Sequence, residues 1–171
     1  MRNSNTSWLL WASMLILAVI LACLIYAVYL YNVMYDNKTA GFDETSEQIM
    51  SQTAIEKVEN IEQYNGSSAY HVIFGINNKE EEKLIFYPLE GKEKELTTLD
   101  RAEIMPEEEV LNLWKTKCNE CELVKIVPAL ESNEALWQIT YHDSDNRYVM
   151  EYVSIYDGTP VEQYRITRMF K

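Results

Sequence analysis

The amino-acid sequence predicts an α+β protein: a single N-terminal transmembrane helix, then two tandem modules that each combine a helix with an antiparallel meander. The first observation is the placement of charge, because residues 3–35 hold no charged side chain and every charged residue except Arg2 follows them. The second is an internal repeat in the remainder of the chain. The third is that a helical pattern precedes alternating strand patterns in each copy, which favours an α+β unit.

The apolar segment at residues 8–33 has the length and composition of a membrane anchor. At about 1.5 Å per residue, a helix from Trp11 to Tyr29 spans about 28 Å, close to the hydrocarbon thickness of a bilayer. Trp8 lies at one end of this segment and Tyr31 lies at the other, as expected for amphipathic rings at the two interfaces. No second segment of this kind occurs in the sequence, which excludes a multi-span transporter.

The flanking charges predict the orientation of this anchor. Arg2 precedes it and Asp36, Asp43 and Glu44 follow it, so we expect residues 1–7 in the cytoplasm and the body outside, after a stalk at 34–42. A cleaved signal peptide would need a shorter apolar core and a cleavage site of small residues such as Ala-x-Ala, which residues 30–33 do not supply. Lipidation of Cys23 stays open, because residues 20–23 approximate a lipoprotein box, although the chain remains apolar beyond it.

The body is strongly acidic. Of the 15 basic residues only Arg2 lies outside residues 36–171, so 14 basic and 27 acidic side chains give that part a net charge of −13. Binding to nucleic acid depends on Lys and Arg that neutralise phosphates, so we exclude this partner class. The length of the body suits one domain or two small ones.

The first module is expected at residues 43–100. Its helix is predicted from a capping-box pattern, Thr45 with Gln48, and from Met50, Ala54 and Val58 on one helical face. Four strands should follow, at residues 61–64, 70–76, 84–87 and 95–98, separated by turn residues such as Asn65-Gly66.

The second module is expected at residues 104–171. Pro106 suits the first helical position, the glutamates at 107–109 complement the helix dipole, and Val110, Trp114 and Cys118 form the buried stripe. Strands are predicted at residues 123–130, 136–141, 148–156 and 161–167. The repeat aligns Tyr70 with Trp137, 67 positions later, and likewise residues 85–86 with 152–153 and 90–91 with 157–158.

These features together resemble one known family. The N-terminal anchor, the two copies, and the segments at residues 69–75, 137–141 and 152–158 are similar to the TseB (YpmB-like) family of cell wall elongation regulators from low-GC Gram-positive bacteria. The resemblance implies tandem cystatin-like or PepSY-like domains. It also implies a single-pass protein of the cell membrane, with an extracytoplasmic body that binds and modulates a class B penicillin-binding protein. It implies no active site and no cofactor. The alternative is an extracytoplasmic peptidase inhibitor or chaperone-like module.

Cys118 and Cys121 have the spacing of a redox motif. A reactive thiol usually lies at a helix N-terminus, whereas this pair falls at a predicted C-terminus beside Glu120 and Glu122, which disfavours the thiolate. A structural disulfide or two inert thiols are therefore expected outside the membrane, with a thiol–disulfide enzyme as a third hypothesis.

Metal binding is not expected from this sequence. Zinc would need further ligands, and the two histidines, His71 and His142, are predicted on separate strands and on the sheet face away from the core. The segment at residues 143–146 has acidic residues but lacks EF-hand spacing, so a solvated hairpin turn is expected instead of a calcium site. No hydrolase signature or phosphate-binding glycine loop occurs.

Tyrosine is the most frequent aromatic residue, with 12 copies. Tyrosines on strands usually cover half-buried sheet faces, but they also suit protein interfaces. We expect a partner surface, if there is one, at Tyr148, Tyr152, Tyr156 and Tyr164. Because the envelope polymers and lipid headgroups of such bacteria are anionic, the acidic body predicts a protein partner with a basic patch.

Overall fold

The computed structural model describes residues 4–91, 95–118 and 120–167 of the chain. Contacts between residues divide it into two units, Met1–Gly41 and Phe42–Lys171. Parts of three predicted segments therefore lie outside the described residues: 1–3 of the cytoplasmic end, 92–94 of the first module, and 119 and 168–171 of the second.

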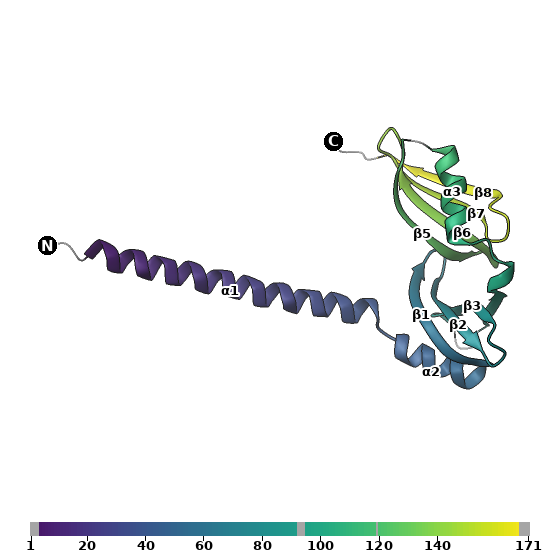
Figure 1. Ribbon diagram of the computed structural model, residues 1–171, viewed down its shortest axis with the longest axis horizontal. Helices are drawn as coiled ribbons and strands as arrows, with labels where there is room; N and C mark the ends of the chain where they lie inside the picture. Colours follow the sequence, from purple (N-terminus) through teal and green to yellow (C-terminus); the bar gives the residue numbers. More distant parts are fainter. Residues whose placement is uncertain (1–3, 92–94, 119, 168–171) are drawn as a thin grey trace. The chain divides into compact units, whose positions relative to one another are not determined.

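The first unit contains one long helix, α1, which covers Ser4–Lys38 (Figure 1). Its stretch Leu10–Tyr35 is long and apolar enough to cross a membrane. Large apolar side chains along this stretch, including Trp11, Ile25 and Tyr31, are exposed. The helix continues through residue 38 and so includes part of the segment predicted as a stalk.

The first module begins with helix α2, Phe42–Gln52. The chain then forms a meander whose strands lie side by side in sequence order. These strands are β1 (Ile55–Asn65), β2 (Ala69–Asn77), β3 (Glu82–Pro88) and β4 (Thr97–Asp100), and neighbouring strands are antiparallel.

The second module repeats this order after a short 3-10 helix, η1, at Arg101–Glu103. Helix α3 covers Glu107–Lys117, and the second meander contains β5 (Glu122–Glu131), β6 (Glu134–His142), β7 (Tyr148–Ser154) and β8 (Pro160–Ile166). Figure 1 shows α3 beside this sheet. The α+β class and the arrangement of two helix-plus-meander modules are confirmed.

Helix α3 forms as the sequence predicts. Pro106 occupies the N-cap position, one residue before the expected place, and three glutamates fill the first turn. Val110 and Trp114 are buried against the second sheet, and the Trp114 ring lies 5.5 Å from that of Tyr141.

The predicted face of helix α2 is wrong. The helix ends at Gln52, so Ala54 and Val58 lie outside it, and Met50 is exposed. The buried residues of α2 are Thr45 and Ile49. Thr45 is not a cap but lies inside the helix.

Strand β1 explains why this prediction failed. The register of β1 against β2 shifts twice, between Ile55 and Lys57 and between Val58 and Asn60. Each shift inserts an extra residue, so Ile55, Val58 and Ile61 all turn toward α2. Val58 therefore belongs to this irregular strand, and its spacing of four from Ala54 does not reflect a helical face.

The hydrophobic core has two parts. The smaller part lies between α2 and the first sheet and contains Ile49, Ile73 and Ile85. The larger part is shared, because Val72 and Phe86 of the first sheet belong to one cluster with Leu136 and Tyr152 of the second. The first sheet is thus buried on both faces.

The repeat is real in topology, but its predicted offset of 67 is wrong. Residues directly opposite in an antiparallel pair share a face of the sheet. By this rule Tyr70 lies on the face of the first sheet away from α2. Trp137 packs on the opposite kind of face, toward α3. The helix-facing residues His71 and Ile73 correspond instead to Trp137 and Ile139, an offset of 137 − 71 = 66. An odd error in register exchanges the two faces of every strand.

Candidate interaction surface

Strand register places three of the four predicted tyrosines on one face of the second sheet. Tyr148 is opposite Ile166 and Met150 is opposite Tyr164, and the same pairing continues to Tyr152. We call these five residues the tyrosine face. It is the face away from α3, because the intervening residues Glu151 and Val153 turn toward that helix.

The fourth residue, Tyr156, is in a different place. It follows β7 in the turn that leads to β8, where its backbone N–H donates to the Ser154 hydroxyl at 3.3 Å. Its side chain is 51% exposed. Tyr156 therefore lies outside the strand pairing that defines the tyrosine face.

Tyr152 is buried inside the protein, with 7% of its surface exposed. Gln138 donates from Nε2 to its hydroxyl oxygen at 2.7 Å, and the hydroxyl of Tyr64 from the first module lies 3.5 Å away. The prediction that Tyr152 offers its ring to a partner is therefore corrected: this tyrosine joins the two modules.

The side chains of Tyr164 and Ile166 are exposed to solvent. They are 47% and 53% exposed, and the Tyr164 ring meets that of Tyr152 edge to face at 6.1 Å. Tyr148 is half-buried and lies 5.7 Å from the ring of His142. The available part of the face is thus the part along β8.

A carboxylate between the modules completes the contact at Tyr64. The Tyr64 hydroxyl donates to Glu131 Oε1 at 2.6 Å, and the Ser67 N–H donates to both carboxylate oxygens, at 3.1 and 3.3 Å. Glu131 ends β5, while Ser67 lies in the turn after β1. The sequence showed only two turns here, so nothing in it indicated that they meet.

The electrostatics of this contact favour an ionised glutamate. Burial raises the pKa of Glu131, but the hydrogen bonds from Ser67 and Tyr64 outweigh it and hold the pKa below its usual value. Burial, followed by the hydrogen bond to Glu131, raises the pKa of Tyr64 far above its ordinary value. Tyr64 therefore stays a neutral donor at physiological pH.

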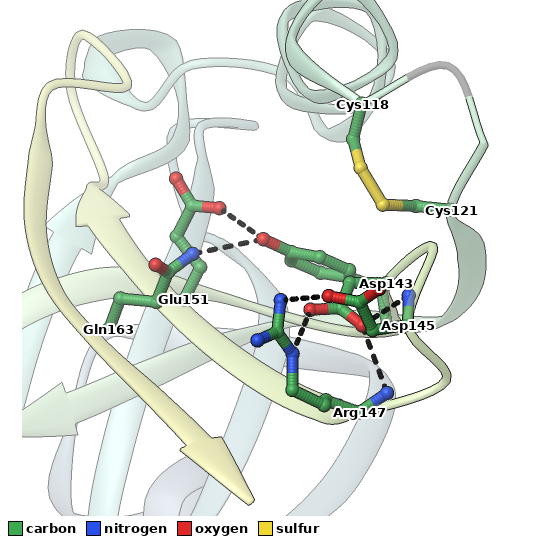
Figure 2. The surroundings of a disulfide bond; sticks show 8 residues. Cys118, Cys121, Asp143, Asp145, Arg147, Glu151 and Gln163 are labelled. Atoms are coloured by element: carbon green, nitrogen blue, oxygen red, sulfur yellow. Dashed lines mark hydrogen bonds and ion pairs between the residues drawn. A yellow bond between two sulfur atoms is a disulfide. The ribbon is translucent and has the colours of Figure 1, made fainter. Parts of the chain in front are cut away.

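A disulfide joins Cys118 and Cys121, as Figure 2 shows. It connects the end of α3 to the start of β5, and both cysteines pack against the shared core. In the figure the bond lies near the Asp143–Arg147 turn. Of the three cysteines, Cys23 is free and exposed on α1.

The Asp143–Arg147 turn closes the hairpin between β6 and β7, in the place where the sequence predicts a hairpin turn. The Asp143 carboxylate accepts from the backbone N–H of Asp145 and Arg147 and from Arg147 Nε at 2.7 Å. Asp145 pairs with the same guanidinium at 2.8 Å. Both carboxylates are thereby used to shape the turn.

A polar group also lies on the α3 side of the second sheet. The Tyr141 hydroxyl donates to Glu151 Oε2 at 3.2 Å and accepts from Gln163 Nε2 at 2.9 Å (Figure 2). Burial, with the nearby Glu151 charge, raises the pKa of Tyr141 to about 12. This group fastens β8 to the centre of the sheet.

The histidines are placed differently from the prediction. His71 does point away from Tyr70 and Val72, but that face is covered by α2, so His71 is buried. Thr45 Oγ1 lies 2.8 Å from His71 Nδ1, and the Phe42 ring packs edge-on at 4.9 Å. His142 is half-buried on the other sheet. Within the described ranges, no three His, Cys, Asp or Glu residues are grouped to hold a metal ion.

A cleft of about 300 Å³ lies between the first sheet and the start of α3. Both of its cations are engaged: Lys83 contacts Glu81 and Asp100 at 2.9 Å. The Arg101 guanidinium lies 5.1 Å from the Phe74 ring centre. The lining residues are Glu59, Asn60, Glu62, Phe74, Gly75, Glu82, Lys83, Arg101 and Glu107.

Comparison with known proteins identifies relatives of this chain. Residues 44–88, from α2 to the end of β3, match the model of the cell wall elongation regulator TseB-like domain. The chain is 24% identical over 140 residues to a probable cell wall elongation regulator TseB from Bacillus subtilis (strain 168), an alignment that covers 82% of this chain and 86% of the relative.

A solved structure supports the same relationship at the level of fold. The YpmB protein from Bacillus subtilis superposes with a TM-score of 0.66 at 20% identity, over 74% of this chain and 98% of that one. The topology, the domain match and the alignment across both modules agree. The chain is therefore a distant homologue of the TseB/YpmB-like cell wall elongation regulators.

Proposed function

We propose that this chain is a non-enzymatic, single-pass membrane protein that regulates cell wall elongation by binding and modulating a class B penicillin-binding protein. The observation that carries the proposal is the alignment with a probable elongation regulator over 82% of the chain, a length that must extend into both modules. Residues 43–100 and 104–171 are the two binding modules, and residues 34–42 connect them to the anchor.

Helix α1 supplies the membrane anchor. Its exposed apolar side chains over Leu10–Tyr35 suit a lipid environment. The short positive end at Arg2 stays in the cytoplasm, and the acidic body is extracytoplasmic. Confinement of both proteins to one membrane raises their effective concentration, so that a weak contact between their outer domains is sufficient.

The tyrosine face is the proposed contact. Tyr164 and Ile166 expose apolar area, and Tyr148 continues the same face. Aromatic side chains of this kind are enriched at protein interfaces. The net charge of −13 on residues 36–171 favours a partner with a basic patch.

The test is an in-membrane crosslink and pull-down of the full-length protein, with the eluate labelled by fluorescent penicillin. We expect a labelled transpeptidase band that an α1-only control does not capture. Absence of that band, with the bait shown to be folded and exported, would reject the proposed partner. Inhibition of a secreted peptidase by the body would then favour the peptidase-directed alternative.

A second experiment tests the charge. Reversal of exposed glutamates such as Glu56, Glu59 and Glu108 should weaken partner capture and reduce its dependence on salt. Unchanged capture with unchanged salt dependence would contradict a basic partner.

A further inference from the structure

Two of the four sheet edges in the body carry devices that block pairing with another chain. Edge strands expose unpaired backbone groups, and proteins protect them with charges, prolines, irregularities or short length. Strand β1 carries four charged residues and two register shifts. Strand β5 carries Lys125, Pro128 and one register shift.

The other two edges differ from each other. Strand β4 is short, with four residues. Strand β8 has seven residues, all exposed, and its one register shift is at its beginning, opposite Val153. From Val161 to Ile166 it contains no proline and no lysine. Among these four edges, β8 is therefore the least protected over residues 161–166, where Glu162 and Arg165 are its charged residues.

Strand β8 also concentrates the exposed apolar surface of the body. Val161, Tyr164 and Ile166 are 48%, 47% and 53% exposed. Tyr156, which is 51% exposed, lies in the turn that precedes this strand. The edge thus offers both backbone hydrogen bonds and side-chain contacts to an added strand, the two requirements of strand addition.

The charges near β8 are mainly negative. Glu162 lies on the tyrosine face, where its hydrogen bond to Tyr164, followed by burial, raises the pKa of that phenol. Glu131 acts on the same phenol from the module contact, and Glu151 lies opposite Gln163. Arg165 is the one basic residue within the strand. An added segment is therefore favoured when it carries positive charge.

We propose that an extended, basic segment of the partner protein pairs with β8 and becomes a fifth strand of the second sheet. The identity of that partner as a transpeptidase rests on the proposed function, whereas the mode of binding rests on the free edge. The segment presents apolar side chains to Tyr164 and Ile166 and a lysine or arginine to Glu162.

A second copy of this chain fits the edge less well. Two β8 strands related by a two-fold axis would place residues of one sheet face opposite residues of the same face. Glu162 and Arg165 lie on opposite faces, because they pair with Tyr152 and Val149. A symmetric pair would therefore gain no ion pair between them.

The test uses the full-length chain in its host membrane with three edge variants. Tyr164→Lys and Ile166→Lys place a lysine on the edge, and Glu162→Lys reverses the charge expected to meet the partner. The matched controls are Val124→Lys, which is 49% exposed on β5, and Glu122→Lys on the same strand. A photo-crosslinking residue at position 165 then identifies the contacted peptide.

We expect each β8 lysine to reduce capture of the penicillin-labelled band about tenfold, as for loss of an interface hot spot, with β5 variants near wild type. The crosslinked peptide should be extended and basic, and β8 amides should gain protection from hydrogen exchange in the complex. Thermal unfolding of the variants should match wild type, because all of the substituted side chains are exposed.

The outcomes separate the two proposals. Capture of the transpeptidase with equal loss in β5 and β8 variants, or without amide protection in β8, would overturn strand addition and leave the proposed function standing. Crosslinks from β8 to a basic segment of a protein that penicillin does not label would support strand addition and reject the transpeptidase. Crosslinks from β8 to a second copy of this chain would overturn the proposal.

Discussion

The two modules share one topology but differ in how their sheets are covered. In the first sheet, Ile73 and Ile85 pack against α2, while Val72 and Phe86 pack into the core shared with the second module. In the second sheet, α3 covers one face, and the other is covered at Tyr152 but exposed at Tyr164 and Ile166. The two modules therefore share a fold but not an exposed sheet face, because both faces of the first sheet are used for packing.

The largest expected effect comes from the shared core. Phe86→Ala removes a fully buried ring on the module-facing side of the first sheet. We expect a loss of about 3–5 kcal/mol in the free energy of unfolding, the usual cost of such a cavity. Because the core is shared, the full chain in detergent should unfold in one transition at lower temperature, which calorimetry would measure.

Two further variants complete this comparison. Ile85→Ala, on the α2 side, should cost about 2–5 kcal/mol, while Tyr164→Ala on exposed β8 should change stability little. Separate melting of the two modules after Phe86→Ala would show that the shared core does not couple them.

The disulfide gives the next largest effect and belongs to the second module alone. Cys118 and Cys121 are three positions apart, and a cross-link that closes so short a loop stabilises by about 2 kcal/mol in the chain-entropy description. Replacement of both by serine should lower the free energy of unfolding by that amount. Cys23→Ser is the control and should leave unfolding of the body unchanged. An equal effect of dithiothreitol on wild type and the double variant would contradict the bond.

The contact between the modules should be sensitive to pH. Glu131→Gln keeps the shape of the side chain but removes the charge that strengthens its hydrogen bonds, with an expected loss of about 1.5 kcal/mol at pH 7. The folded-state pKa of Glu131 is lowered, so its contribution is present above its unfolded pKa of about 4.3 and lost as the pH falls through the folded value.

The difference in stability between wild type and Glu131→Gln should therefore shrink below about pH 4, as measured by urea unfolding at several pH values. Glu134→Gln, an exposed residue in the same hairpin, serves as the control. A difference that stays constant from pH 7 to pH 3 would show that ionised Glu131 is not what joins the modules.

The sequence predicted the fold where periodicity was simple and failed where a local irregularity changed it. Alternating strands, turn residues and the stripe of Val110 and Trp114 each report a short-range pattern, and these features formed as expected. The spacing of Met50, Ala54 and Val58 fitted a helix face, but Val58 belongs to β1, and the two register shifts of that strand have no signature in the sequence.

The candidate surface was predictable only in part. The sequence placed the four tyrosines only in one region. Their faces follow from the strand register, and burial of Tyr152 depends on Tyr64 from the other module. The contact of Ser67 with Glu131 joins residues 64 positions apart and has no local signal. Tertiary contacts of this kind decide which tyrosine side chains remain exposed to solvent. A role of the exposed tyrosines in partner binding stays a prediction.

The smallest expected effect tests a buried polar contact between α2 and the first sheet. Helix α3 packs through Trp114 on Tyr141, whereas α2 also places the Thr45 hydroxyl 2.8 Å from buried His71. Thr45→Val keeps the shape and removes this hydrogen bond, for an expected loss of about 1 kcal/mol, or a few degrees in melting temperature. Thr116→Val in α3 is the matched control, since its hydroxyl is exposed and contacts only a local carbonyl, that of Leu113, among the described hydrogen bonds. Equal melting temperatures for wild type and Thr45→Val would mean that this hydrogen bond does not stabilise the packing of α2 on the sheet.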